Sequence, residues 1–444
     1  MTQKNEVDTA TPPDYDVFIV GGGPAGATTA ALLAESGHRV MVADKDRHPR
    51  FHIGESLLPH NLPLLDRLGV RDQIEQGSMT KHGIEFVSAY HGKTVTYDFA
   101  RALDRRFPYS FQVRRSSFDH VLLKNAVAKG ADIIEGCRIT SVTFPGAGHP
   151  VITGINEAGT EQSWTAKFIV DASGRDTLLA GQLGLKERNP KNSSAAMFGH
   201  FTNARRLSGK DEGNISVVWF DNGWFWFIPL ADGTTSIGAV CPASFFKDRG
   251  TDITNFFMTT IASCPEIASR LKDAQLVGPV TATGNYSYSA RQASGDKFIM
   301  VGDAFSFIDP VFSTGVYLAM TMGFRGAEAV AACLSKPEKS AKILRRYDAG
   351  ARNALGAFTW FIYRIREPAM RNLFMSPRNY FRVEEAVLSL LAGDMQGGWS
   401  TRWRLYIFRT IYYITKFAHL RHLVHNVKPR QTKPLAPASA EATG

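Results

Sequence analysis

The chain has 444 residues, of which 44% are hydrophobic, and a formal net charge of +10. This length suits two or three domains, or one large cofactor domain with additions, and the hydrophobic content is ordinary for a globular protein. No stretch approaches the roughly 20 apolar residues of a spanning helix, which excludes an integral membrane protein. Residues 1–14 lack the layout of a signal peptide, so we predict a disordered lead-in and a cytoplasmic location.

The cysteines are scattered, and none of them is paired at the spacing of a CxxC motif. This pattern argues against a zinc site and against a disulfide framework, and it suits a reducing compartment. We therefore expect no metal. The four cysteines are Cys137, Cys241, Cys264 and Cys333.

Residues 15–44 predict a strand, a glycine-rich turn, a helix and a second strand that ends at Asp44. Gly21 permits a sharp turn, Gly23 lets the backbone approach a pyrophosphate, and Gly26 lets the helix pack against the sheet. Asp44 follows at the spacing where a carboxylate accepts bonds from a ribose. The stretch predicts a dinucleotide site at a helix N-terminus, and the alternative is a plain glycine-rich turn in a βαβ unit.

Further segments favour the same cofactor. The Gly-Glu-Ser turn at residues 54–56 can lay a carboxylate along it, and residues 131–136 predict a third parallel strand. Arg115, at a helix start, can reach a ribose or pyrophosphate, although a surface arginine fits the position equally well. Lys81 enters a strand region, and a lone lysine there is usually a solvated edge residue.

Residues 139–170 predict a meander, and the strand after it ends in the polar turn 171–175. Strands of alternating polarity then predict a largely antiparallel second sheet at about 195–290, with one helix at 253–271. This sheet would wall a substrate chamber. Its expected strands are 197–201, 215–220, 224–229, 235–240 and 276–288.

A buried strand at 297–301 runs into Gly302 and Asp303, where a carboxylate can bond a ribityl chain. The Ser-Thr-Gly turn at 313–315 then opens a helix whose N-terminal amides would face a ring system. Such a terminus stabilises an anion beside it.

Residues 336–433 predict an aromatic and basic helical region, followed by a disordered tail at 434–444. No acidic residue lies between Asp394 and Glu441, while Arg402, Arg409 and Lys416 recur every seven residues along a predicted helix. The helices either cap the substrate chamber, which we favour, or dock an acidic acyl carrier protein. We expect no nucleic-acid partner because no recognition motif accompanies the charge.

The order and spacing of the cofactor motifs resemble the class A flavoprotein monooxygenase fold over residues 14–335. The resemblance implies an α/β fold with an FAD-binding Rossmann-type βαβ sheet, a largely antiparallel substrate-side sheet and a C-terminal helical region. No second glycine-rich turn is present, so we expect no Rossmann site for NADPH. The motifs are Gly21–Gly26, Asp44, Asp171–Arg175 and Gly302–Asp303.

Local stretches narrow the resemblance to flavin-dependent halogenases, in the branch that acts on phenols and pyrroles. Residues 223–229 match the WxWxIP signature, and Lys81 looks like the lysine that those enzymes place at the end of a tunnel. Residues 307–315 resemble their halide and flavin turn. Phe312 stands where tryptophan halogenases carry an acid, which puts free tryptophan in doubt as the substrate.

The resemblance implies that a separate flavin reductase supplies reduced FAD (FADH2), which with O2 and chloride or bromide gives hypohalous acid. Lys81 would be catalytic, holding the hypohalous acid by a hydrogen bond or carrying the halogen as a haloamine. The halide would lie at Thr314 and Gly315, and Trp224, Trp226 and Pro229 would shield the flavin. The substrate would be a small aromatic, free or tethered to a carrier protein. The expected FAD-binding residues are Gly21, Gly22, Gly23, Ala25, Gly26, Asp44, Arg50, Glu55, Ser56, Arg115, Arg138, Asp171, Gly174, Asp303 and Val316.

Other functions stay open at this point. An aromatic hydroxylase on the same fold would use NAD(P)H directly, and a prenyl-chain reductase would use the basic aromatic helices for membrane contact. A flavin-holding protein without turnover is the alternative outside enzymes. Core packing explains the pair Trp224 and Trp226 as well as a gate does, because alternate strand residues share one face.

Overall fold

Two sheets make up the body of the molecule, seen in a computed structural model that describes residues 12–146, 148–189, 193–284, 287–394 and 397–426. Most of the predicted lead-in and the whole predicted tail lie outside the described residues. No helix in the described ranges is long and apolar enough to cross a membrane.

The first sheet is built on parallel strands whose apolar runs are buried, as expected when both faces of a sheet are covered. Val20 pairs with Ala43 on one side and with Asp171 on the other. The glycine turn, Asp44 and Asp171 therefore meet at one edge, the carboxyl end where α/β folds bind ligands. In spatial order the parallel strands are β19 (Phe298–Met300), β10 (Glu161–Asp171), β1 (Tyr15–Val20), β2 (Val40–Asp44) and β7 (Asp132–Glu135).

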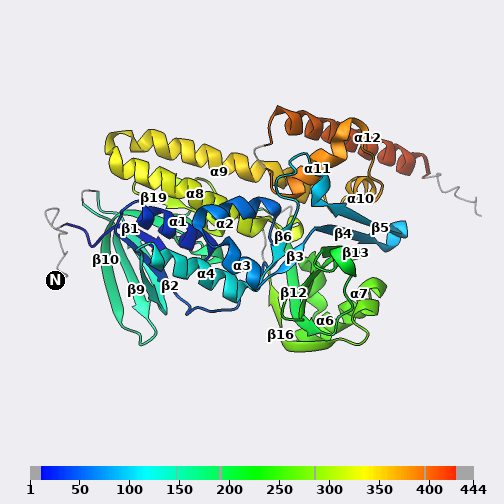
Figure 1. The fold of residues 1–444 in the computed structure, drawn as a ribbon, viewed down its shortest axis with the longest axis horizontal. Coiled ribbons are helices and arrows are strands. Elements are labelled where there is room, and N and C mark those ends of the chain that lie inside the picture. The colour runs from blue at the N-terminus through cyan, green and yellow to red at the C-terminus, as the bar shows by residue number, and fades with distance from the viewer. Residues whose placement is uncertain (1–11, 147, 190–192, 285–286, 395–396, 427–444) are drawn as a thin grey trace, which may run out of the picture.

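Helices cover one face of this sheet and a meander adjoins the other (Figure 1). Helix α1 (Pro24–Glu35) packs between α4 (Arg115–Ala128) and α8 (Thr314–Ser335), and α9 (Ser340–Ile362) lies along α8. The predicted meander consists of β8 (Cys137–Thr143) and β9 (Val151–Asn156), which pair antiparallel and continue into the long β10.

The second sheet is largely antiparallel, as predicted, but it extends beyond the predicted segment. Residues 83–98 form two of its strands, and β4 joins β13 through the only parallel pairing among its described strands. Residues 83–98, which precede the predicted segment in the chain, thus complete the second sheet. In order the strands are β16 (Gln275–Thr283), β12 (Ser194–Thr202), β15 (Thr235–Pro242), β14 (Gly223–Pro229), β13 (Ile215–Phe220), β4 (Gly83–Ser88) and β5 (Lys93–Asp98).

Two expectations about this region are wrong. The strand predicted at 276–288 ends at Thr283, and Tyr288 belongs to β17 (Tyr288–Ala290) in a small separate sheet. The helix predicted at 253–271 is two helices, α6 (Ile253–Ala262) and α7 (Pro265–Arg270). Proline has no N–H to continue a helix and disfavours helical geometry in the residue before it, so the chain restarts at Pro265.

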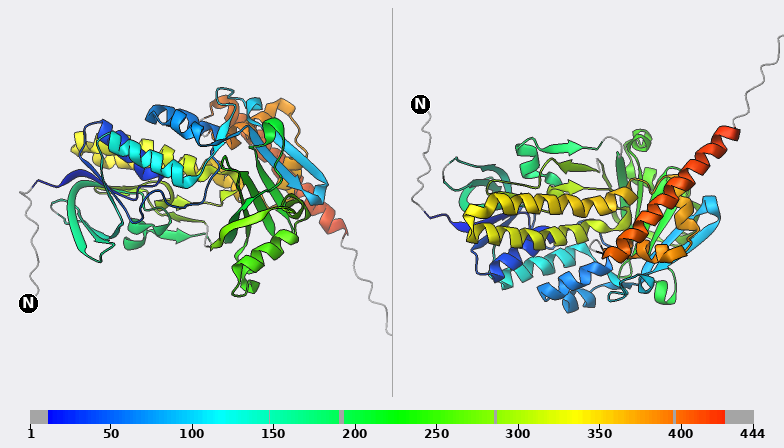
Figure 2. Two further views of the ribbon diagram at one scale, coloured as in Figure 1. Left: turned by 60° about the horizontal axis from the view of Figure 1, so that its bottom comes forward. Right: turned by 90° about the horizontal axis from the view of Figure 1, so that it is seen from above.

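The C-terminal helices lie against the face of the second sheet that carries Phe86 and Trp224 (Figures 1 and 2). Phe361, Phe374 and Phe408 from these helices share one buried cluster with Phe86 and Trp224 of the sheet. This packing agrees with the capping role that we favoured. The helices are α10 (Pro368–Met375), α11 (Val383–Leu391) and α12 (Trp399–Asn426), after α9.

The predicted basic stripe of α12 is not a free surface. Arg409 lies 5.1 Å from the ring centroid of Trp360, and the Lys416 ammonium donates to a Glu367 carboxylate oxygen at 2.7 Å. Arg402 is exposed. Helical spacing placed the three cations on one face of α12. Two of them, Arg409 and Lys416, contact residues of the preceding part of the chain.

Candidate active site

The glycine turn after β1 has the geometry that its sequence predicts. Gly21 has φ +101°, and a Cβ there would stand 2.4 Å from the carbonyl oxygen of Ala172. A Cβ on Gly26 would stand 1.9 Å from the carbonyl oxygen of Gly21, so the helix starts in direct contact with the turn. At Gly23, the N-cap of α1, the nearest atom to a Cβ is an Arg50 nitrogen at 3.6 Å. The turn is a cradle at a helix N-terminus, where amides and the dipole favour phosphate.

A cavity of about 770 Å³ begins at this cradle and runs between the two sheets. Its wall includes Asp44 of the first sheet and Trp224 of the second, so both sheets contribute to it. Most of the predicted site lines it: Gly21, Gly23, Ala25, Asp44, Arg50, Glu55, Ser56, Arg115, Arg138, Gly174, Trp224, Trp226, Asp303, Thr314, Gly315 and Val316. Five predicted residues do not: Gly22, Gly26, Lys81, Asp171 and Pro229.

Asp44 is buried at the end of β2 and braces the turn. Its carboxylate accepts a bond from the Gly22 amide at 2.7 Å and another from the Asp46 amide at 2.9 Å. Asp171 has a comparable local role, because it accepts from the amides of Ser173 and Leu179 at 2.9 and 2.8 Å. Both acids fix the shape of the cavity edge, and only Asp44 also lines the cavity.

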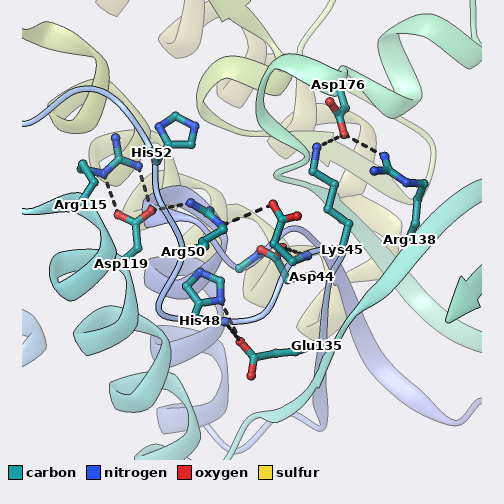
Figure 3. A network of polar contacts seen from close by, with 12 residues as sticks. Asp44, Lys45, His48, Arg50, His52, Arg115, Asp119, Glu135, Arg138 and Asp176 are labelled. Carbon is teal, nitrogen blue, oxygen red and sulfur yellow. Dashed lines mark hydrogen bonds and ion pairs between the residues drawn. The ribbon is translucent and has the colours of Figure 1, made fainter. Parts of the chain in front are cut away.

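Two arginines of the cavity wall converge on Asp119 (Figure 3). Arg115 donates to its two carboxylate oxygens at 2.7 and 2.9 Å, and Arg50 donates at 3.2 Å. Arg115 also donates to the Ile53 carbonyl oxygen at 2.8 Å, which ties down the segment that follows β2. Burial and the charge of Arg115 lower the pKa of His52 to about 4, so this imidazole is neutral at pH 7.

A second polar group lies at the Asp44 end of the cavity (Figure 3). Lys45 and Arg138 both contact the Asp176 carboxylate, at 2.5 and 3.4 Å. His48 pairs with Glu135 at 2.9 Å. Arg138 thus lines the cavity, as predicted, but its guanidinium pairs with Asp176.

The polar turns at the far end of the first sheet also reach the cavity. Burial raises the pKa of Asp303 to about 6, against the opposing charges of Arg115 and Arg175, so its carboxyl is largely ionised at pH 7. The α8 helix begins at Thr314, directly after Ser313 with φ +56°. The first three residues of this 22-residue helix line the cavity, and the positive end of a helix dipole suits a small anion.

The second sheet supplies the aromatic wall. The rings of Trp224 and Trp226 lie 6.1 Å apart on one face, and both residues are buried and line the cavity. The Trp226 indole donates to the Ser236 hydroxyl at 3.2 Å. A Cβ on Gly238 would stand 2.2 Å from the Trp226 ring, so this glycine makes the room for it. The pair therefore packs in the core and also lines the cavity, so core packing and a role at the cavity are compatible.

Lys81 is completely buried, which overturns the expectation for a lone edge lysine. It ends β3 (Met79–Lys81), and its ammonium donates to the Ser56 hydroxyl at 2.9 Å and the Leu57 carbonyl at 3.1 Å. The Phe99 ring lies 5.3 Å away. None of the ion pairs found in the described residues includes Lys81. Burial lowers its pKa to about 7.

Several residues of the site escaped the sequence analysis. Asp119 follows Arg115 at the i,i+4 spacing of a helical ion pair, so that signal was present in the sequence. His200 was not predicted; it contacts the carboxylate of the predicted Glu55 at 3.0 Å across 145 residues, and no local sequence pattern indicates such a contact. Phe198 joins the aromatic wall from β12.

The cavity fits FAD on the grounds of shape and chemistry. The cradle at Gly21–Gly26 suits the pyrophosphate, and the buried Nε of Arg50 has no hydrogen-bond partner in the described structure. Asp44 ends β2 and Asp303 follows β19, with β10 and β1 between these strands, and both acids line the cavity, where a ribose and a ribityl chain were predicted. The geometry defines a class, a dinucleotide-binding α/β protein whose cavity has an aromatic wall.

Comparison with known proteins agrees with that class. A family model described as FAD binding domain matches residues 14–359. A 1H-pyrrole-2-carbonyl-[peptidyl-carrier protein] chlorinase from Pseudomonas fluorescens is 31% identical over 87% of this chain and 90% of its own. A tryptophan 2-halogenase from Chondromyces crocatus is 35% identical over 72% of this chain, which spans 61% of that relative. The solved structure of CndH, a myxobacterial chondrochloren halogenase, is 31% identical, with a TM-score of 0.77 over 86% of this chain and 91% of its own.

The chain belongs to the FAD binding domain family and, within it, to the flavin-dependent halogenases. It is an FAD-dependent enzyme that halogenates an aromatic compound, as the motifs predicted.

Proposed function

We propose that this halogenase acts on an electron-rich ring, a phenol or a pyrrole, and that Lys81 presents the activated halogen to it. The supporting observation is the burial of Lys81 among neutral oxygens, one hydrogen bond away from the cavity. A fully buried lysine with a structural role is normally paired with a carboxylate, because an unpaired buried charge is costly. An unpaired one suits a chemical role.

Each end of the cavity has a separate task in this proposal. Bound reduced FAD supplies, with oxygen and chloride or bromide, the hypohalous acid. Thr314 and Gly315 hold the halide at the N-terminus of α8. Lys81 either donates a hydrogen bond to the hypohalous acid or exchanges an N–H proton for the halogen and releases water. With a pKa of about 7, both its ammonium and its amine are present at neutral pH.

The substrate class rests on the chamber and on the relatives. Phe312 is buried and its ring stacks 6.1 Å from that of Phe374, so no carboxylate stands at that position to activate a poor ring. The pyrrole chlorinase covers nearly the whole chain and by name acts on a ring held by a peptidyl carrier protein. We infer that the substrate ring of this enzyme is also bound to a carrier protein. We also infer that a separate flavin reductase supplies its reduced FAD. Its cytoplasmic location, its domain boundaries and the roles of its site residues stay predictions.

The test compares the wild type with Lys81→Ala. Each protein is incubated with FAD, a flavin reductase, NADH, bromide and an activated phenol, and products are measured by mass spectrometry. We expect product to fall at least about 100-fold in the variant while NADH is still consumed, since hydrogen bonding or covalent transfer at one residue supplies factors of this size. The exposed Lys93→Ala serves as the control.

Equal product from the wild type and Lys81→Ala would remove Lys81 from the mechanism. A second arm omits bromide and searches for a product heavier by one oxygen. Its formation would support an aromatic hydroxylase in place of a halogenase.

A further inference from the structure

Two neighbouring segments, β6 (Ser110–Gln112) and residues 56–57, set the position of Lys81. Its strand β3 pairs with β6, with Lys81 opposite Ser110. On the other edge of β6, Ser56 forms a bridge with Gln112, and the Leu57 amide donates to the Phe111 carbonyl at 2.9 Å. Strand β6 therefore lies between Lys81 and Ser56, and the lysine side chain crosses it to reach the Ser56 hydroxyl.

The surroundings of the ammonium are polar but uncharged. Its two acceptors are the Ser56 hydroxyl and the Leu57 carbonyl. By register, Ser110 and Gln112 share the face of β6 that Lys81 crosses, and both are fully buried. Ser110 Oγ and Gln112 Oε1 have no hydrogen-bond partner among the described residues. Buried polar atoms are normally satisfied, so these two oxygens stand as further uncharged acceptors on the face that the lysine side chain crosses.

Ser56 connects these buried polar groups to the cavity. It lines the cavity, whereas Lys81 does not. A hydroxyl can accept a bond from an ammonium and can donate one to a neutral amine, but a carbonyl oxygen can only accept. Of the two partners of Lys81, Ser56 alone can therefore serve both protonation states of the lysine.

We propose that Ser56 is a positioning residue: its hydroxyl holds the Lys81 nitrogen at the cavity wall and sets the balance between ammonium and amine. This assignment rests on the proposed role of Lys81, and it replaces the sequence expectation that Ser56 binds FAD. The ammonium donates to Ser56 at rest. In the structure the two atoms lie 2.9 Å apart, and when Lys81 is neutral the hydroxyl turns its proton toward the amine and keeps the contact.

The experiment uses the full-length enzyme loaded with FAD and compares Ser56→Ala, Ser56→Thr, Lys81→Ala and the double variant Ser56→Ala/Lys81→Ala. The measured quantity is the fraction of hypohalous acid that reaches an activated phenol rather than a free β-diketone trap. Ser78→Ala is the matched control, because Ser78 lies just before β3 and donates to the Ile74 carbonyl instead. The FAD dissociation constant of each variant is measured by fluorescence.

Ser56→Ala should lower the delivered fraction about 10- to 100-fold, the effect of one lost hydrogen bond to a charged group. Ser56→Thr should restore most of it. The ammonium loses an acceptor, so the pH midpoint of delivery should move about one unit lower in Ser56→Ala. If the alkaline limb of the pH profile of delivery moves, the ammonium is the active form. If the acidic limb moves, the amine is the active form.

The double variant should deliver no less than Lys81→Ala. Wild-type delivery by Ser56→Ala, or an additive loss in the double variant, would overturn the positioning role. If weaker FAD binding accounts for the loss of delivery, Ser56 binds FAD, as the sequence predicted, and the positioning role is refuted. Unchanged delivery by Lys81→Ala would instead refute the proposed function itself.

Discussion

Replacing Asp119 with alanine removes the carboxylate on which two arginines of the cavity wall converge. Asp119 is fully buried and accepts bonds from Arg115 at 2.7 and 2.9 Å and from Arg50 at 3.2 Å. Without it, Arg115 keeps its charge at 5% exposure and retains the Ile53 carbonyl as an acceptor. We expect the variant to lose stability and to loosen the segment that follows β2.

The size of the loss follows from the burial. Removing one partner of a buried ion pair costs about 3–5 kcal/mol, because the other charge is left uncompensated. Unfolding entropy is about 2.1 cal/mol/K per residue, which for 444 residues gives about 0.9 kcal/mol/K. The Asp119→Ala variant should therefore melt about 3–5 °C below the wild type at neutral pH.

The effect should depend on pH in a defined direction. Burial acts to raise the pKa of Asp119, but the charges of Arg115 and Arg50 outweigh it and lower that pKa below its ordinary value. A lowered folded-state pKa gives stability that is present above the unfolded pKa of about 3.9 and lost as pH falls through the folded value. The difference between wild type and variant should thus shrink below about pH 4.

Thermal unfolding followed by circular dichroism at pH 7.5 and in acid measures both effects. Asp119→Asn keeps an acceptor, so its melting temperature should lie between those of the wild type and Asp119→Ala. Asp72→Ala, which replaces an exposed acid on α3 (Arg71–Gln76), is the control. A neutral-pH shift under 1 °C, or a difference that does not change with pH, would refute the reasoning.

Two other substitutions probe the cavity wall. Gly26→Ala would set a methyl group 1.9 Å from the Gly21 carbonyl oxygen, so we expect a loss of about 1–3 kcal/mol and weaker FAD binding by fluorescence titration, while Gly181→Ala, in open space, keeps both. Trp226→Phe deletes the indole bond to its serine partner and should cost about 1 kcal/mol more in urea unfolding than Trp224→Phe, whose indole N–H has no partner in the described structure. Wild-type FAD affinity in Gly26→Ala, or equal urea midpoints for the two tryptophan variants, would contradict these expectations.

Local sequence predicted the cofactor side well, because its determinants are local. A glycine turn between a strand and a helix needs Gly21 and Gly26 for steric reasons that any neighbourhood shares. The same holds for the turn before α8 and for the pairing of Trp224 with Trp226 on one strand face. Pro265, which divides α6 from α7, was visible in the sequence, and the prediction passed over it.

Long-range contacts decided the remainder. The sequence by itself determined an FAD-binding α/β fold, an aromatic wall and a lysine of chemical interest, since turn sterics and strand alternation act over a few residues. Only the tertiary structure decided that Lys81 meets Ser56 across β6, that residues 83–98 complete the second sheet, and that Lys416 pairs with Glu367. Burial and pairing of charges are properties of the packed chain, because the partners lie 25 to more than 100 residues apart and only folding brings them together.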